Sequence, residues 1–170
     1  LIRWNKPDIG IVSPVEFIPV AEESGLISEI GRWALKQACM DCKKWHTLGF
    51  DNLSVAVNLS PVQFRRGNLP TVVFRALKNA DLDSRFLELE ITESLFIDDI
   101  DHVKEQLHSI ASKGITVAID DFGTGYSNLN YLSKFNATTL KLDMSFVLEM
   151  LKSKQQEHMV TAIIEMSKVM

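Results

Sequence analysis

Four short segments in which aliphatic and polar residues alternate constrain the fold of this chain more than any other feature. They are residues 54–58, 87–91, 116–120 and 139–143. Because successive side chains of a strand point to opposite faces, each segment would have one aliphatic face and one polar face. Strands buried on both faces of a parallel sheet usually read as continuous apolar runs instead. The polar face therefore needs an explanation beyond packing.

Helical patterns follow these predicted strands. They are expected at residues 69–79, 98–113 and 127–134, and from 155 to the end of the chain. Alternation of strand and helix implies right-handed crossovers and a parallel sheet. Polar residues at the strand ends, Asn58, Glu90, Asp120 and Lys141, follow one another at intervals of 32, 30 and 21 residues. A strand–helix–strand unit of roughly 30 residues has this spacing.

The part of the chain before these strands predicts helices. Ser13 can cap a first helix, and Glu16 stands where a capping box needs an acidic side chain. Pro19 is expected to break this helix into two short pieces, and Gly25 is expected to end the second piece. A longer helix is expected over residues 28–48.

The polar faces favour a barrel over a sheet with helices on both sides. A second helix layer would bury these charges, and an unpaired buried carboxylate is costly. A closed barrel instead gathers such groups at its C-terminal mouth, where barrel enzymes carry their chemistry. The expected fold is therefore α/β, a TIM-like (β/α) barrel. Such a barrel needs about 250 residues, and this chain has 170. We therefore expect one incomplete barrel domain over residues 1–170.

Composition excludes several classes of function. The 18 Lys and Arg against 22 Asp and Glu give a formal net charge of −4 without a basic tract, which argues against binding a nucleic-acid polymer. No apolar run approaches the roughly 18 residues of a membrane helix, so this segment is expected to make no membrane contact. Two cysteines build no disulfide framework, and a cytoplasmic location is expected. Cys39 and Cys42 fall in mid-helix, where core packing is the favoured interpretation.

The strand ends form a candidate catalytic group. It consists of Asn58, Glu90, Asp120, Asp121 and Lys141. Oxygen ligands without Cys or clustered His favour Mg²⁺ or Mn²⁺ over Zn²⁺. Adjacent carboxylates could serve two ions about 3.5–4 Å apart, a pair suited to phosphodiester chemistry. The alternative is that these charges neutralise each other in buried ion pairs. The residue pattern alone leaves both interpretations open.

Five motifs resemble those of the EAL-domain family in order and spacing. They are SPVEFIP (13–19), VAVNLS (55–60), ELEITES (88–94), DDFGTGYS (120–127) and LKLD (140–143). The resemblance implies a bacterial phosphodiesterase that linearises the second messenger cyclic di-GMP to pGpG. It also implies a modified TIM barrel and two Mg²⁺ or Mn²⁺ ions.

The resemblance also implies roles for individual residues. Metal binding would fall to Asn58, Glu90, Asp120 and Asp121. Lys141 would hold the catalytic water, and Glu93 would anchor the loop 122–127. Arg3 would contact a substrate phosphate, for which its guanidinium is well suited.

The family pattern extends beyond both ends of the chain. Leu1 matches the leucine of the Glu-Ala-Leu signature, so the first strand, the last strands and two metal-binding glutamates are expected outside these residues. The chain alone is therefore expected to be inactive. Its complete form would act in a multidomain signalling protein that other segments could anchor to a membrane, and it would form a homodimer. The alternative is a non-catalytic cyclic di-GMP receptor or protein-interaction module, whose mark is loss of ligand residues, and no such substitution occurs here.

Overall fold

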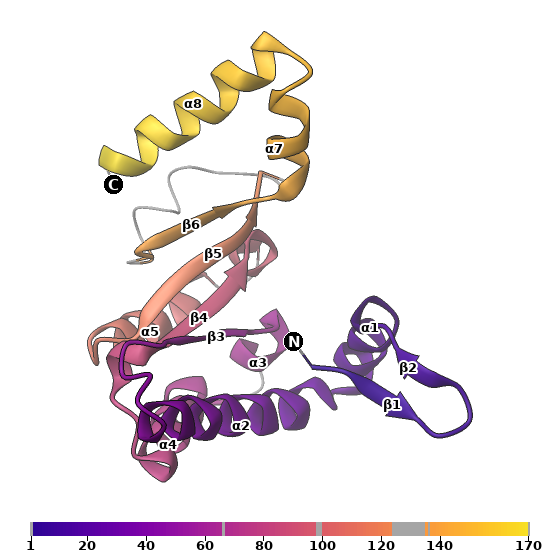
Figure 1. Cartoon of the computed structure of the whole chain (residues 1–170), viewed down its shortest axis with the longest axis vertical. Coiled ribbons are helices and arrows are strands. Elements are labelled where there is room, and N and C mark those ends of the chain that lie inside the picture. The colour runs from indigo at the N-terminus through magenta and orange to yellow at the C-terminus, as the bar shows by residue number, and fades with distance from the viewer. Residues whose placement is uncertain (1, 66, 98–99, 124–134, 136, 170) are drawn as a thin grey trace.

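A computed structural model describes residues 2–65, 67–97, 100–123, 135 and 137–169 of the chain. Its centre is a parallel sheet whose strands lie in the order of the sequence (Figure 1). The strands are β3 (Val55–Asn58), β4 (Leu87–Thr92), β5 (Thr116–Phe122) and β6 (Thr139–Leu142). The predicted strands and their parallel arrangement are thus confirmed.

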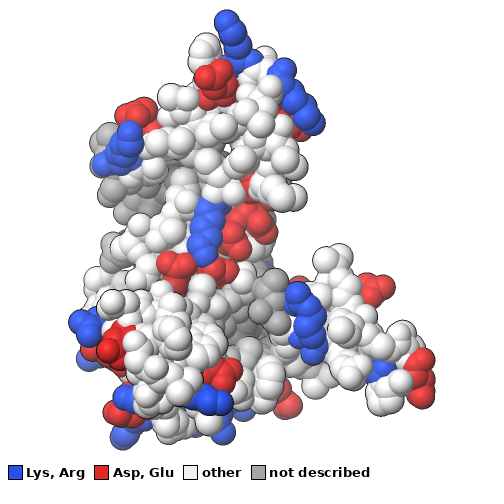
Figure 2. All heavy atoms as spheres, in the orientation of Figure 1, with Lys and Arg blue, Asp and Glu red and all other residues white. Residues whose placement is uncertain are grey.

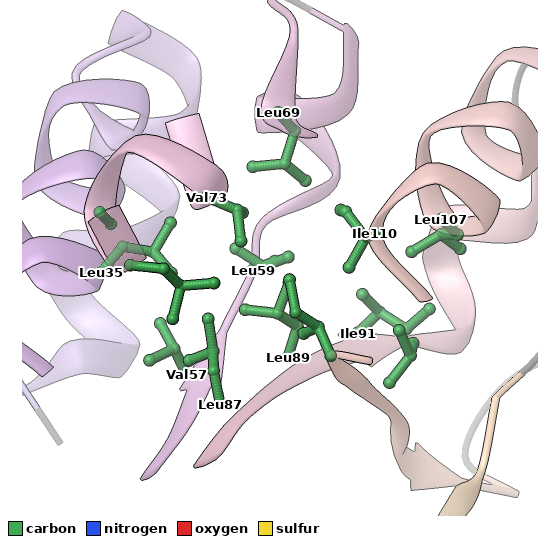
Figure 3. Packing of buried hydrophobic residues seen from close by; sticks show 14 of the residues in the cluster. Leu35, Val57, Leu59, Leu69, Val73, Leu87, Leu89, Ile91, Leu107 and Ile110 are labelled. Carbon is green, nitrogen blue, oxygen red and sulfur yellow. The ribbon is translucent and has the colours of Figure 1, made fainter. Parts of the chain in front are cut away.

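Helices cover the aliphatic face of this sheet. They are α2 (Ile27–Thr47), α4 (Leu69–Ala80) and α5 (Ile100–Ala111). Figure 3 shows the resulting core, in which Leu87, Leu89 and Ile91 of β4 point toward the helices. These three side chains are almost completely buried. Burial of such side chains stabilises a fold by about 1.5–3 kcal/mol each.

The segment before α2 differs from the sequence prediction. An antiparallel hairpin of β1 (Trp4–Lys6) and β2 (Gly10–Val12) comes first, and it was not expected. Pro19 was expected to break the next helix, but α1 (Pro14–Ser24) runs through it. Proline removes one backbone donor, and its ring crowds the carbonyl of the residue four positions earlier. Phe17 and Ala21, on either side of it, are both buried, so core packing holds the two halves in one helix.

Other boundaries agree more closely with expectation. Gly25 ends α1 in the left-handed conformation, with a φ of 79°. Cys39 and Cys42 are buried in α2 as free thiols, which confirms core packing. Two short helices, α3 (Pro61–Arg65) and α7 (Met144–Met150), were not predicted. The expected helix 127–134 lies outside the described residues.

The chain ends in a helical pair. After β6, α7 packs against α8 (Lys154–Val169), and the pair lies beyond the β6 edge of the sheet (Figure 1). No helix in the described ranges combines the length and the apolar character needed to cross a membrane. Since the helices cover the aliphatic face of the sheet, the candidate functional site lies on its polar face.

Candidate functional site

Asn58 and Glu90 meet at the carboxyl ends of β3 and β4. The parallel register pairs them directly. Asn58 donates a hydrogen bond from Nδ2 to Oε2 of Glu90, at 2.6 Å. Glu90 is buried, with an exposed fraction of 8%. A buried carboxylate requires such partners, because burial without them disfavours its charged form.

Lys141 supplies the positive charge of this group. Its Nζ forms an ion pair with Oε1 of Glu90 and lies 3.0 Å from Oε1 of Glu88. Desolvation acts to lower the pKa of Lys141, but the hydrogen bonds to Glu90 and Glu88 outweigh it and raise the pKa above its ordinary value of 10.5. Lys141 therefore carries its proton at neutral pH and serves as a fixed cation and hydrogen-bond donor.

Asp120 and Asp121 lie at an irregularity of the sheet. Ile119 pairs with Leu140 and Phe122 pairs with Leu142, so the two aspartates face a single residue of β6, Lys141. This is the count of a β-bulge, which bends a strand and redirects its side chains. Asp121 accordingly has a left-handed φ of 53°. The bulge breaks the simple alternation that would send adjacent aspartates to opposite faces.

Negative charge gathers around Asp121. Desolvation raises the pKa of its carboxyl group, as do the charges of Asp120, Asp143 and Glu90. Asp143 caps α7 by accepting a hydrogen bond from the backbone N–H of Ser145 at 2.9 Å. Figure 2 shows acidic side chains beside a basic one on the face of the molecule over the sheet. The carboxylates thus outnumber the local cation.

Glu93 holds the backbone that follows the bulge. Its Oε1 accepts a hydrogen bond from the backbone N–H of Gly123 at 3.1 Å. Gly123 has a φ of +99°, and a Cβ there would collide with the ring of Phe146. Only glycine fits such a position without strain. The remainder of the predicted loop, 124–127, lies outside the described residues.

Hydrogen bonds of Ser60 with Glu22 and Gln63 stabilise the turn after Asn58. Ser60 donates from Oγ to Oε1 of Glu22 at 2.7 Å, which joins this turn to α1. Its backbone N–H donates to Oε1 of the buried Gln63 at 2.9 Å. These contacts fix the backbone two residues after Asn58. Sequence reasoning missed Glu22, because no local pattern pairs residues from separate elements. It also missed Gln63, which could have been found because it lies three residues after Ser60, as in a capping box.

Arg3 lies apart from the strand-end group. It is exposed, and its Nη1 donates to the carbonyl oxygen of Ile2 at 2.9 Å. No hydrogen bond or ion pair found among the described residues joins it to Asn58 or Glu90. Arg3 instead lines a mainly apolar cavity of about 460 Å³ together with Trp4 and Trp33. The structure therefore brings together the other predicted residues but not this one.

The donor set of the strand ends suits a hard divalent cation. Its side chains offer oxygen ligands, which Mg²⁺ and Mn²⁺ prefer. A bound cation would also relieve the crowding of negative charge that Asp120, Asp143 and Glu90 produce around Asp121. Across the described ranges, no group of three or more His, Cys, Asp or Glu side chains is already arranged to hold a metal ion. The ammonium of Lys141 occupies an oxygen of Glu90 that a cation would use.

Two residues near this group were absent from the predicted site. Glu88 contacts Lys141, and Asp143 adds charge near Asp121. Both were recognisable in principle, because strand alternation places Glu88 on the same face as Glu90 and Asp143 on the same face as Lys141. Strand alternation does not show which residues of neighbouring strands lie opposite each other, so it could not show these contacts.

Comparison with known proteins points to one family. The model of the EAL domain matches residues 1–170. The uncharacterized protein y4lL of Sinorhizobium fredii is 47% identical over 163 residues, which are 96% of this chain and 19% of that protein. The bifunctional diguanylate cyclase/cyclic di-GMP phosphodiesterase MucR of Pseudomonas aeruginosa is 38% identical over 170 residues, covering all of this chain and 25% of that protein. The chain thus spans about a fifth to a quarter of these relatives.

Solved structures agree with the sequence comparison. A structure described as the PaMucR phosphodiesterase in complex with c-di-GMP matches with a TM-score of 0.92 and 38% identity. The match covers 99% of this chain and 68% of that one. The parallel sheet and its helices therefore correspond to the TIM-like barrel of such domains.

Proposed function

Because this chain belongs to the EAL domain family, we propose that the protein carrying it hydrolyses cyclic di-GMP to linear pGpG. Relatives whose names state cyclic di-GMP phosphodiesterase activity support this substrate. The observation that carries the proposal is the contact of Asn58, Glu90 and Lys141 beside the Asp120–Asp121 bulge. Carboxylates that can hold divalent cations, beside a fixed positive charge, suit phosphodiester hydrolysis, and this chain has both at one strand edge.

The proposal assigns the cation site to four residues. Asn58, Glu90, Asp120 and Asp121 would hold Mg²⁺ or Mn²⁺, with two ions in the complete site. Such ions stabilise charge on a phosphodiester and make bound water more acidic. The amide hydrogen bond of Asn58 orients the Glu90 carboxylate, and the bulge supplies two adjacent carboxylates.

Three further residues act around this cation site in the proposal. Lys141 donates hydrogen bonds and, as a fixed positive charge, would orient the attacking water and offset charge on the phosphate. Glu93 holds Gly123, and thereby the backbone next to Asp121. Arg3 would bind a substrate phosphate, which requires the hairpin β1–β2 to bring it toward the strand ends.

The decisive experiment is turnover of cyclic di-GMP by the complete protein with Mn²⁺ or Mg²⁺, detected as pGpG. Asp120→Ala is expected to abolish turnover, because it removes a ligand from the bulge. Asp51→Ala, in the exposed turn that precedes the amino end of β3, is the matched control and is expected to keep wild-type activity. Full activity of Asp120→Ala would overturn the assignment.

The same experiment addresses the receptor alternative. A folded protein that binds cyclic di-GMP without producing pGpG would be a receptor. The proposal also includes a cytoplasmic location and a homodimer of the complete domain. Light scattering on the purified protein tests the dimer.

A further inference from the structure

Glu88 is a charged residue of the polar face to which the proposed function gives no role. We propose that Glu88 is a positioning residue, which provides a second carboxylate for the Lys141 ammonium so that Glu90 can bind a cation. This inference rests on the cation site of the proposed function.

The geometry places Lys141 between these carboxylates. Glu88 and Glu90 are two residues apart on β4, so both side chains lie on one face. The Nζ of Lys141 contacts Oε1 of each, at 3.0 Å for Glu88. The register partners of Glu88 are Ala56 on β3 and Thr116 on β5, both small, which leaves room for the long lysine side chain.

A cation that binds Glu90 would share the two carboxylate oxygens with the partners already there. Oε2 of Glu90 accepts from Asn58, and Oε1 holds Lys141. A cation at Glu90 would displace the ammonium, because like charges repel. Glu88 has Lys141 as its one ion-pair partner within the described residues, so it can keep the ammonium when Glu90 releases it.

The solvent exposure of the three side chains supports a shift of the Lys141 ammonium from Glu90 to Glu88. The exposed side-chain fractions are 11% for Glu90, 22% for Glu88 and 34% for Lys141. The ammonium can therefore shift toward Glu88 and remain both paired and partly hydrated. Without Glu88, Lys141 would keep Glu90 as its one ion-pair partner among the residues that the structure describes, and it would compete with the cation for the same oxygen.

A double-mutant cycle tests the inference by Mn²⁺ binding. Calorimetry on metal-free complete protein would compare wild type, Glu88→Gln, Lys141→Met and the double variant. Glu88→Gln is expected to weaken Mn²⁺ binding about tenfold when Lys141 is present. In the Lys141→Met background the same change is expected to weaken binding by less than about threefold, because no ammonium remains to compete. Glu105→Gln, exposed on α5, is the matched charge control and should leave binding unchanged.

Equal weakening in both backgrounds would overturn the inference, because it would mean that Glu88 acts only through its own charge. No weakening in either background would overturn it too. If Glu88→Gln fails to fold, Glu88→Asp takes its place in the cycle under the same two criteria, with a smaller weakening expected. Failure of the wild type to bind Mn²⁺ would reject the cation site itself. Coupling without pGpG formation would reject the proposed reaction and leave the positioning role in place.

Discussion

Asn58 and Glu90, which are 32 residues apart in the chain, share a 2.6 Å hydrogen bond between Nδ2 and Oε2. The bond exists because β3 and β4 pair in parallel with these two residues in register. It orients a carboxylate whose other oxygen is held by Lys141. The amide of Asn58 therefore contributes to the site before any cation is bound.

Replacement of Asn58 by Ala should destabilise the metal-free protein. Oε2 of Glu90 would lose its donor in a buried place, which costs about 1–2 kcal/mol of unfolding free energy. Urea denaturation in the presence of a chelator measures this cost. Asn52→Ala, in an exposed turn, is the control and should change stability by less than about 0.5 kcal/mol. Equal stability of the two variants would show that the hydrogen bond contributes little.

Glu93→Ala should impair turnover much more than stability. The variant leaves the Gly123 N–H without its 3.1 Å acceptor and frees the backbone next to Asp121. We expect cyclic di-GMP turnover to fall at least about tenfold, with a loss of unfolding free energy near 1 kcal/mol. Glu93→Gln keeps an acceptor oxygen and should be milder. A fully active Glu93→Ala protein would remove Glu93 from the proposed site.

Gly31→Ala should destabilise the fold although alanine favours helices. Gly31 is in the interior of α2, where alanine would contribute about 1 kcal/mol of helix propensity. A Cβ there would lie 2.7 Å from Cδ of the buried Gln63, whose Oε1 accepts from the Ser60 N–H. Displacing Gln63 should give a net loss of about 1–2 kcal/mol.

The control for this substitution is Gly67→Ala, where no atom lies within 4 Å of the added Cβ. Thermal unfolding of both variants measures the difference. A stabilised Gly31→Ala protein would show that the Gln63 side chain moves aside without cost. It would also show that the turn at Ser60 does not need its hydrogen bond to Gln63.

The ion pair of Lys43 with Asp81 should make stability depend on pH. A 2.8 Å hydrogen bond and the charge of Lys43 lower the pKa of Asp81 below its ordinary value of 3.8. The unfolded state therefore takes up a proton at a higher pH than the folded state. The stabilisation is present above about pH 3.8 and is lost as pH falls through the lowered pKa of the folded protein.

Asp81→Asn removes this charge and suits the left-handed φ of 52° at this position. The variant should have a lower urea midpoint than the wild type at pH 6, and the difference should shrink as the pH is lowered toward 3. Asp51→Asn, for which the structure gives no ion pair among the described residues, is the control. A difference that stays constant with pH would contradict the role of the charge.

Much of the sheet was predictable because its signals are local. Alternation of Leu87, Leu89 and Ile91 with polar neighbours needs only adjacent residues, and the structure buries all three. The same alternation placed Asn58 and Glu90 on a common face, and the structure joins them. The hairpin β1–β2 has strands of three residues each, too short for a period to be visible.

The sequence by itself determined the order of the strands from β3 to β6, the family motifs and the chemical types of the site residues, because these depend on neighbours in the chain. Only the tertiary structure decided that α1 runs through Pro19 and that a bulge sets Asp120 and Asp121 against one residue of β6. It also decided that Lys141 lies between Glu88 and Glu90. Lys141 and Glu90 are 51 positions apart, and register between strands, which no local pattern specifies, brings them into contact.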